Sequence, residues 1–209
     1  MELLLIRHAQ PMLVERTDGQ PADPPLTELG HRQAGAMAEW LATEKIHALY
    51  VSPLQRARQT AQPLSERCGQ PAQPLDGVAE YDRLHSTYVP IEELKARNRD
   101  GDGQGWEALL AGGRSEERHR WRAEVVAVIE ELVVAHRGHN VAVVCHGGVI
   151  NAYVTHILGI HQPLVYEPHY TSINRVVAAT TGERTVATLN EAPWLRNLPS
   201  PTSRPTVGG

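Results

Sequence analysis

The sequence is poor in several residue types and patterns, and each shortage excludes a class of protein. It has 209 residues but no phenylalanine, so aliphatic side chains must form most of the core. Its two cysteines, Cys68 and Cys145, are too few for a disulfide framework. No segment reaches the roughly 18 apolar residues that cross a bilayer, and the first residues have neither the basic leader nor the cleavage site of a signal peptide. We therefore expect a cytoplasmic protein that contacts no membrane.

Positive charge is not in excess either. Lys and Arg number 20 against 24 Asp and Glu, which gives a formal net charge of -4. This balance offers no general attraction for nucleic acid, so we expect no nucleic-acid partner, and any affinity for phosphate must be local. Hydrophobic residues make up 41% and charged residues 21%, as in ordinary globular proteins. The length favours a single domain.

Short apolar runs alternate with helical patterns along the chain. Runs of buried-strand type lie at residues 3–6, 48–51 and 141–145, and a closing strand pair is expected at 173–180 and 185–189. Helical patterns separate the first three runs, which is typical of βαβ units. We therefore predict an α/β fold: a three-layer αβα sandwich with a mostly parallel sheet and one antiparallel strand at an edge.

The expected helices begin at recognisable caps. Thr27 precedes a helical pattern that reaches about residue 41, and Ser115 precedes one that reaches His136. Ser52-Pro53-Leu54-Gln55 has the pattern of a capping box, with Ser52 as the N-cap. Gly69 should end this helix. A fourth helix is expected from Val149 to about residue 158.

The remaining segments define the domain organisation. Residues 1–190 are expected to form one domain, in which residues 9–26 form a long functional loop. Residues 77–114 are irregular and are expected to form a cap over the site. Residues 191–209 contain four prolines and are expected to form a loosely attached tail.

Polar residues follow each of the first three predicted strands. The first run ends in Arg7-His8, the second leads into Ser52 and Arg56, and the third ends in His146-Gly147-Gly148. In a parallel sheet these carboxyl ends meet at one edge, where ligands bind. Arginine side chains bind phosphate with two hydrogen bonds, and a glycine-rich turn before a helix adds amide donors, Gly147 among them. The sequence thus predicts a phosphate site with a histidine in reach.

Four ordered motifs resemble those of the histidine phosphatase superfamily, the phosphoglycerate mutase-like group. They are Leu5-Ile6-Arg7-His8-Ala9, Leu26-Thr27-Glu28-Leu29-Gly30, Ser52-Pro53-Leu54-Gln55-Arg56-Ala57-Arg58-Gln59-Thr60-Ala61 and Val144-Cys145-His146-Gly147-Gly148. The resemblance implies a phosphoglycerate mutase-like fold with His8 as the phosphorylated nucleophile. It also implies that Arg7, Arg56 and His146 hold the phosphoryl oxygens and that Glu80 donates the proton.

The chemistry of these residue types is consistent with that implication. An imidazole attacks phosphorus only when it is neutral, and nearby cations favour its neutral form. The two guanidinium groups would also offset the charge of the phosphoryl oxygens. Glu80 would act first as an acid and then as the base that activates water. Because the arginines and His146 supply the positive charge, we expect neither a metal ion nor a cofactor.

Several assignments have alternatives within the sequence. Asp82 could replace Glu80 as the proton donor, since both would project to the same side of an extended segment. Arg58 is two helical positions from Arg56, so only one of them can face the site, and the motif favours Arg56. Ser52 is interpreted as a cap rather than a nucleophile. His136 and His139 have a metal-like spacing but flank a helix end, which suits their imidazoles.

The chain also departs from the family pattern. Ala9 replaces the glycine that usually follows the Arg-His pair, which should narrow the space beside the nucleophile. Pro11 and Val14 occupy positions where the family commonly has a hydroxyl residue and an asparagine that help to hold phosphate or a phosphoglycerate cofactor. These departures weaken the mutase interpretation.

Three hypotheses follow. The first is a phosphatase that hydrolyses a small phosphomonoester through phosphohistidine at His8. The second is a phosphotransferase like the cofactor-dependent phosphoglycerate mutases, in which a second anion would be held by residues 85–114, through Lys95, Arg97, Arg99 and Arg114. The third is an inactive module that binds a phosphorylated ligand. Specificity should lie in residues 9–26 and 83–114, and the sequence leaves a homodimer open.

Overall fold

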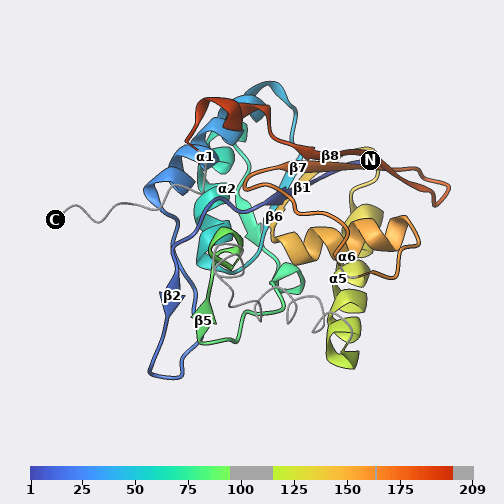
Figure 1. The fold of residues 1–209 in the computed structure, drawn as a ribbon. Coiled ribbons are helices and arrows are strands. Elements are labelled where there is room, and N and C mark those ends of the chain that lie inside the picture. Colours follow the sequence, from blue (N-terminus) through green and yellow to red (C-terminus); the bar gives the residue numbers. More distant parts are fainter. Residues whose placement is uncertain (95–114, 163, 200–209) are drawn as a thin grey trace.

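The computed structural model describes residues 1–94, 115–162 and 164–199, and its centre is a six-stranded sheet (Figure 1). The strand order is β4-β3-β6-β1-β7-β8. The strands are β1 (Glu2–Arg7), β3 (Ala48–Val51), β4 (Ala72–Pro74), β6 (Asn140–Cys145), β7 (Ile173–Ala178) and β8 (Arg184–Glu191). Strands β4, β3, β6 and β1 are parallel, whereas β7 is antiparallel to both of its neighbours. The predicted α/β class with a mostly parallel sheet is confirmed; the antiparallel strand lies one position inside the edge that β8 forms.

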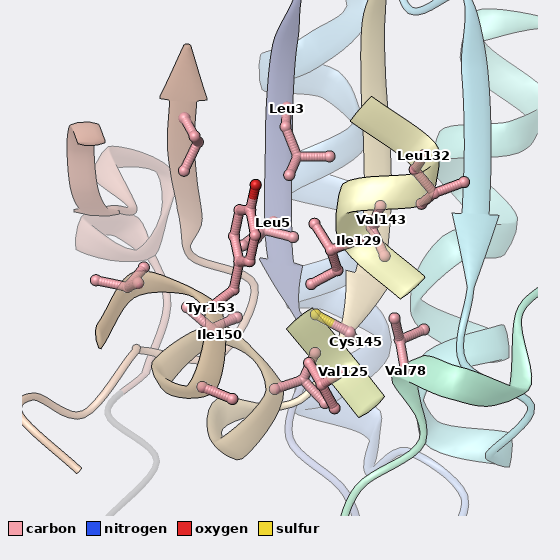
Figure 2. Close-up of a cluster of buried hydrophobic side chains, with 14 of the residues drawn as sticks. Leu3, Leu5, Val78, Val125, Ile129, Leu132, Val143, Cys145, Ile150 and Tyr153 are labelled. Carbon is pink, nitrogen blue, oxygen red and sulfur yellow. The ribbon is translucent and has the colours of Figure 1, made fainter. Parts of the chain in front are cut away.

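Helices cover both faces of this sheet (Figure 1). One face is covered by α1 (Glu28–Trp40) and α2 (Gln55–Cys68), the other by α5 (Glu116–Ala135) and α6 (Gly147–Ile157). The alternating side chains of β1 serve both layers. Leu3 and Leu5 pack in the α5–α6 cluster drawn in Figure 2, and Leu4 packs in the α1–α2 cluster. In the described part of the chain, no helix is both long and apolar enough to cross a membrane.

The helix ends show which local signals were sufficient. Thr27 caps α1 by accepting a hydrogen bond from the amide of Gly30 at 2.9 Å, as predicted. Gly69 ends α2 in the left-handed conformation with φ +65°, also as predicted. Ser115 caps α5 through the amide of Arg118. These signals lie within a few residues of the ends that they define.

The predicted capping box at Ser52 is wrong. Helix α2 begins at Gln55, with Leu54 as its N-cap residue and no side-chain cap from its own segment. Instead, the carboxylate of Asp23 accepts the hydrogen bond of the Gln55 amide, at 2.8 and 3.0 Å. Ser52 is buried, and its hydroxyl lies 2.7 Å from Nε2 of His146. Asp23, from a distant loop, therefore caps the helix, and Ser52 instead hydrogen-bonds His146.

Two segments that the sequence marks as irregular pair with each other. Strand β2 (Val14–Glu15) forms an antiparallel ladder with β5 (Thr87–Tyr88), beside the main sheet in Figure 1. Short 3₁₀ helices lie at η1 (Leu41–Thr43) and η2 (Asp76–Val78). The rest of the expected cap, with Lys95, Arg97, Arg99 and Arg114, lies outside the described residues.

Regular structure continues beyond residue 190. Strand β8 continues to Glu191, and a 3₁₀ helix, η3 (Pro193–Asn197), follows it. Trp194 is buried against the α1–α2 cluster, and its indole nitrogen donates a hydrogen bond to the hydroxyl of Thr171 at 2.9 Å. A single large apolar side chain thus fixes a segment whose prolines suggest looseness.

Candidate active site

The structure brings four predicted side chains together at the carboxyl edge of the sheet. Arg7 and His8 leave β1, Arg56 lies on the first turn of α2, and His146 joins β6 to α6. All four are buried, and the ring centroids of His8 and His146 are 5.1 Å apart. Arg58, by contrast, is exposed, in agreement with the preference for Arg56. We call this group of four side chains the phosphate cup.

The hydrogen bond of His8 fixes which ring nitrogen is free. Nδ1 lies 2.8 Å from the carbonyl oxygen of Ala9, and because a carbonyl oxygen only accepts, Nδ1 carries the proton. In the neutral ring the lone pair is therefore on Nε2. Burial, followed by the charges of Arg56 and Arg7, holds the pKa of His8 well below its usual value. The ring is thus uncharged at neutral pH, with a free lone pair on Nε2.

Arg7 is held in place by one backbone contact and one aromatic ring. Its guanidinium donates a hydrogen bond to the carbonyl oxygen of Pro168 at 2.5 Å. Its Cζ atom lies 4.2 Å from the ring centroid of Tyr170. Buried Nε of Arg7 finds no hydrogen-bond partner in the described chain, so it remains a donor for a ligand.

Arg56, like Arg7, is a buried arginine with an aromatic neighbour and with hydrogen-bond donors left unused by the described residues. It is 1% exposed, and neither its Nε nor one of its terminal nitrogens makes a hydrogen bond to described residues. Its Cζ atom lies 4.4 Å from the ring centroid of Tyr88, and Asp82 is 3.5 Å from a terminal nitrogen. Buried guanidinium donors without hydrogen bonds are costly unless an anion accepts them. The cup is therefore suited to an oxyanion such as phosphate.

His146 completes the cup from the start of α6. Nε2 shares a hydrogen bond with the hydroxyl of Ser52, while buried Nδ1 has no partner among the described residues. Burial and then the charge of Arg56 hold the pKa of His146 well below its usual value. Gly147, the predicted amide donor, is the first residue of α6 and lies beside Arg7, so its amide is at a helix amino terminus.

Glu80 reaches the same helix start from the segment after η2. One of its carboxylate oxygens accepts a hydrogen bond from the amide of Gly148 at 2.9 Å, and the other from the amide of Tyr81 at 3.0 Å. A side chain on Gly148 would overlap this carboxylate, which explains the second glycine of the motif. Burial, and next the charge of Asp82, raise the pKa of Glu80. A raised pKa suits a group that must donate a proton.

The alternative donor, Asp82, also lies at the cup, because the chain turns after Glu80 instead of extending. Its carboxylate lies 3.5 Å from a terminal nitrogen of Arg56. Ala9, the residue that follows His8, packs in a small cluster with Leu26 and Ala34.

Sequence reasoning missed the aromatic walls of the cup, Tyr88 and Tyr170. Tyr170 directly precedes the segment that leads into β7, and Ile173 of β7 pairs with Ile6 of β1. Because β7 is antiparallel, its beginning meets the carboxyl end of β1 at the site. The antiparallel strand was the signal that could have directed attention to residues 168–172.

The other candidates lie away from the cup. His139 precedes β6, at the opposite edge of the sheet, and stacks on His47; His136 hydrogen-bonds Tyr50 at 2.8 Å. Across residues 1–94, 115–162 and 164–199, no three acidic, histidine or cysteine side chains are arranged to hold a metal ion. Cys145 is a buried core residue, and burial raises the pKa of its thiol.

Comparison with known proteins agrees with this geometry. The model of the histidine phosphatase superfamily (branch 1) matches residues 3–192. The chain belongs to this superfamily. The uncharacterized phosphatase PhoE of Bacillus subtilis (strain 168) is 29% identical over 157 residues, which are 74% of this chain and 76% of PhoE.

Two further proteins to which the chain is similar differ in the activities that their names state. The probable phosphoglycerate mutase GpmB of Enterobacter sp. (strain 638) is 25% identical over 169 residues, 77% of this chain and 76% of GpmB. The solved structure of the mycobacterial glucosyl-3-phosphoglycerate phosphatase superimposes with a TM-score of 0.71 at 21% identity, covering 91% of this chain and 99% of that chain. This likeness shows the histidine phosphatase fold.

Proposed function

We propose that the protein is a phosphatase that hydrolyses a small phosphomonoester through a phosphohistidine intermediate on His8. One observation supports this above all: a buried, neutral imidazole, oriented by the Ala9 carbonyl, lies beside two guanidinium groups, and the buried Nε of each makes no hydrogen bond to the described residues. A buried cationic cup of this kind is preorganised for the negative charge of a transferring phosphoryl group.

In the first step, Nε2 of His8 attacks phosphorus, and the bond from phosphorus to the ester oxygen breaks. Glu80 in its protonated form gives its proton to the leaving alkoxide. Arg7, Arg56 and His146, with the amide of Gly147, hold the phosphoryl oxygens. The raised pKa of Glu80 supports its role as the acid.

In the second step, a water molecule attacks the phosphorus of phosphohistidine. Glu80, now a carboxylate, accepts a proton from this water, and the bond between nitrogen and phosphorus breaks. Inorganic phosphate leaves, and His8 recovers its lone pair. The same carboxyl group thus serves both steps and returns to its protonated state.

The surroundings of Arg56 favour hydrolysis over transfer to a second anionic acceptor. Asp82 and Asp23 place carboxylate oxygens 3.5 and 4.0 Å from its terminal nitrogens. These carboxylates repel an additional anion on that side of the cup. Pro11 and Val14 likewise lack the polar side chains that the mutase interpretation requires.

The test is turnover together with capture of the intermediate. We expect p-nitrophenyl phosphate and some members of a panel of phosphomonoesters to be hydrolysed, and phosphorus NMR after rapid denaturation at alkaline pH to show phosphohistidine. The His8→Ala variant should lose both signals, whereas His31→Ala, which changes an exposed histidine, should keep them. Hydrolysis that persists in His8→Ala would refute the proposal. Isomerised phosphoglycerate instead of released phosphate would favour the transferase, and binding without turnover the inactive module.

A further inference from the structure

Tyr170 contacts both members of the Arg7–His8 pair. Its ring lies 4.2 Å from Cζ of Arg7, and its centroid is 5.8 Å from that of the His8 ring. The side chain is 3% exposed. With its two ring contacts it forms one wall of the phosphate cup. None of the motifs in the sequence includes this residue.

The hydroxyl of Tyr170 has a different partner from its ring. It donates a hydrogen bond of 2.7 Å to one carboxylate oxygen of Glu92, and the side-chain amide of Gln10 donates one of 2.9 Å to the other. Glu92 belongs to a helical segment, residues 91–94, that is distant in sequence from both donors. Tyr170 therefore contacts a cation on its face and an anion at its hydroxyl.

The backbone next to Tyr170 is strained and firmly held. Thr171 is β-branched and fully buried, yet its φ is +58°, in the left-handed region. Its amide contacts the carbonyl oxygen of His8 at 3.4 Å, its hydroxyl donates to the Tyr170 carbonyl at 2.7 Å, and Trp194 donates to that hydroxyl. Backbone strain persists only where the surroundings over-determine the conformation, and it concentrates at functional sites.

We propose that Tyr170 is a positioning residue of the phosphate cup, a role that rests on the proposed function. Its ring packs against the guanidinium of Arg7 and keeps that group directed at the phosphoryl oxygens. Its hydroxyl, with Gln10, binds the carboxylate of Glu92 and so prevents it from pairing with Arg7. Without the hydroxyl and the ring, Glu92 would compete with phosphate for Arg7.

The experiment measures the binding of inorganic phosphate and of orthovanadate by titration calorimetry, which needs no turnover. Tyr170→Phe keeps the ring and should weaken phosphate binding by a few fold, about the value of one hydrogen bond that restrains a charge. Tyr170→Leu removes both contacts and should weaken it about tenfold or more, as expected for a desolvated cation–π contact. Tyr166→Phe is the matched control, because its hydroxyl also donates to a buried acceptor, Asn174, at 2.8 Å. It should bind phosphate as the unmodified protein does.

A double variant tests the competition itself. Glu92→Gln in the Tyr170→Leu background should restore most of the lost phosphate affinity, because a neutral amide does not pair with Arg7. In steady-state kinetics, Tyr170→Leu should raise KM more than it lowers kcat, since binding is what Arg7 loses.

The outcomes separate this inference from the proposed function. Phosphate affinity that is unchanged in Tyr170→Leu, equally weakened in Tyr166→Phe, or not restored by Glu92→Gln would overturn the positioning role, whatever the turnover. Conversely, Tyr170-dependent phosphate binding in a protein that hydrolyses no phosphomonoester would support the positioning role and refute the phosphatase.

Discussion

At the level of single residues, the phosphate cup combines two permanent charges with two neutral imidazoles. Burial and the two guanidinium groups act on His8 and His146 in the same direction and keep both rings uncharged. The partly buried carboxyl group of Glu80 experiences the opposite shift, because burial and Asp82 favour its protonated form. The proposed nucleophile and the proposed acid therefore have the required protonation states in the same range of pH.

These shifts predict the pH dependence of the reaction. His8 must be deprotonated, so the rate falls when the pH drops through its lowered pKa; Glu80 must be protonated, so the rate falls when the pH rises through its raised pKa. We expect a bell-shaped profile of kcat/KM between these limits. Glu80→Gln should remove the alkaline limb and lower kcat for alkyl phosphates by about 10²–10⁴-fold, with a smaller effect on p-nitrophenyl phosphate.

The control for this profile is Glu124→Gln, a change at an exposed position of α5 that should leave both limbs in place. The measurement also decides between the two candidate donors. If the alkaline limb survives in Glu80→Gln and disappears in Asp82→Asn, then Asp82 is the acid.

At the level of elements, the start of α2 shows how a loop and a helix together place Arg56. The carboxylate of Asp23 accepts a hydrogen bond from the amide of Gln55, and the side-chain oxygen of Gln59 accepts one from the amide of Leu26. The end of the long loop is thus bound to the first turn of the helix. Arg56 lies between these two contacts, so its position depends on both segments.

Removal of this cap has a predictable cost. Asp23→Ala should lower the free energy of unfolding by about 1 kcal/mol, the usual loss at an N-cap, and Asp23→Asn by less. Asp18→Ala is the control, because Asp18 forms an exposed ion pair with Arg16 that contributes little. Urea denaturation measures all three, and an Asp23→Ala variant as stable as the unmodified protein would show that α2 needs no cap from the loop.

The elements also show how far the sequence determines the structure. The strands β1, β3 and β6, the cap at Thr27 and the stop at Gly69 depend on neighbouring residues, and all were predictable, whereas the short strand β4 was not. The role of Ser52 was not, because its partner His146 is 94 residues away and the true cap, Asp23, is 32 residues from Gln55. Local rules do not detect partners that only the folded chain brings near.

The side chains of the site show the same contrast between what neighbouring residues determine and what the tertiary fold determines. Arg7, His8 and His146 stand at strand ends that periodicity reveals, whereas Tyr88 and Tyr170 lie in segments without periodicity. Their places depend on the β2–β5 ladder and on the direction of β7, and both are properties of the tertiary fold.

For the whole molecule, Arg175 connects segments from both ends of the chain. On β7, it forms ion pairs with Glu2 of β1, with Glu44 after η1 and with Glu191 at the end of β8, at 2.6–3.0 Å. Its side chain is 13% exposed. Although burial alone would raise the pKa of Glu191, the hydrogen bonds from Arg175 and Trp40 lower it.

Arg175→Met should therefore lower the free energy of unfolding at pH 7 by roughly 3 kcal/mol, because three carboxylates lose their shared cation. Since the folded pKa of Glu191 is depressed, this contribution is complete above the ordinary glutamate pKa and is lost as the pH falls through the folded value. The difference in the free energy of unfolding between the variant and the unmodified protein should become smaller toward pH 4. Arg196→Met, at an exposed position, should show no such difference at either pH. Denaturant titrations at both values provide the measurement, and a difference independent of pH would contradict the ionic origin.

The central place of β1 has a consequence for the order of assembly during synthesis. Residues 2–7 leave the ribosome well before residues 140–145 and 173–178, with which they pair. The strand that presents Arg7 and His8 therefore has no hydrogen-bonded neighbours until residues 140–145 have been made. A nascent chain that stalls before residue 140 would contain His8 but not His146, so the proposed phosphoryl chemistry should begin only after both residues have left the ribosome.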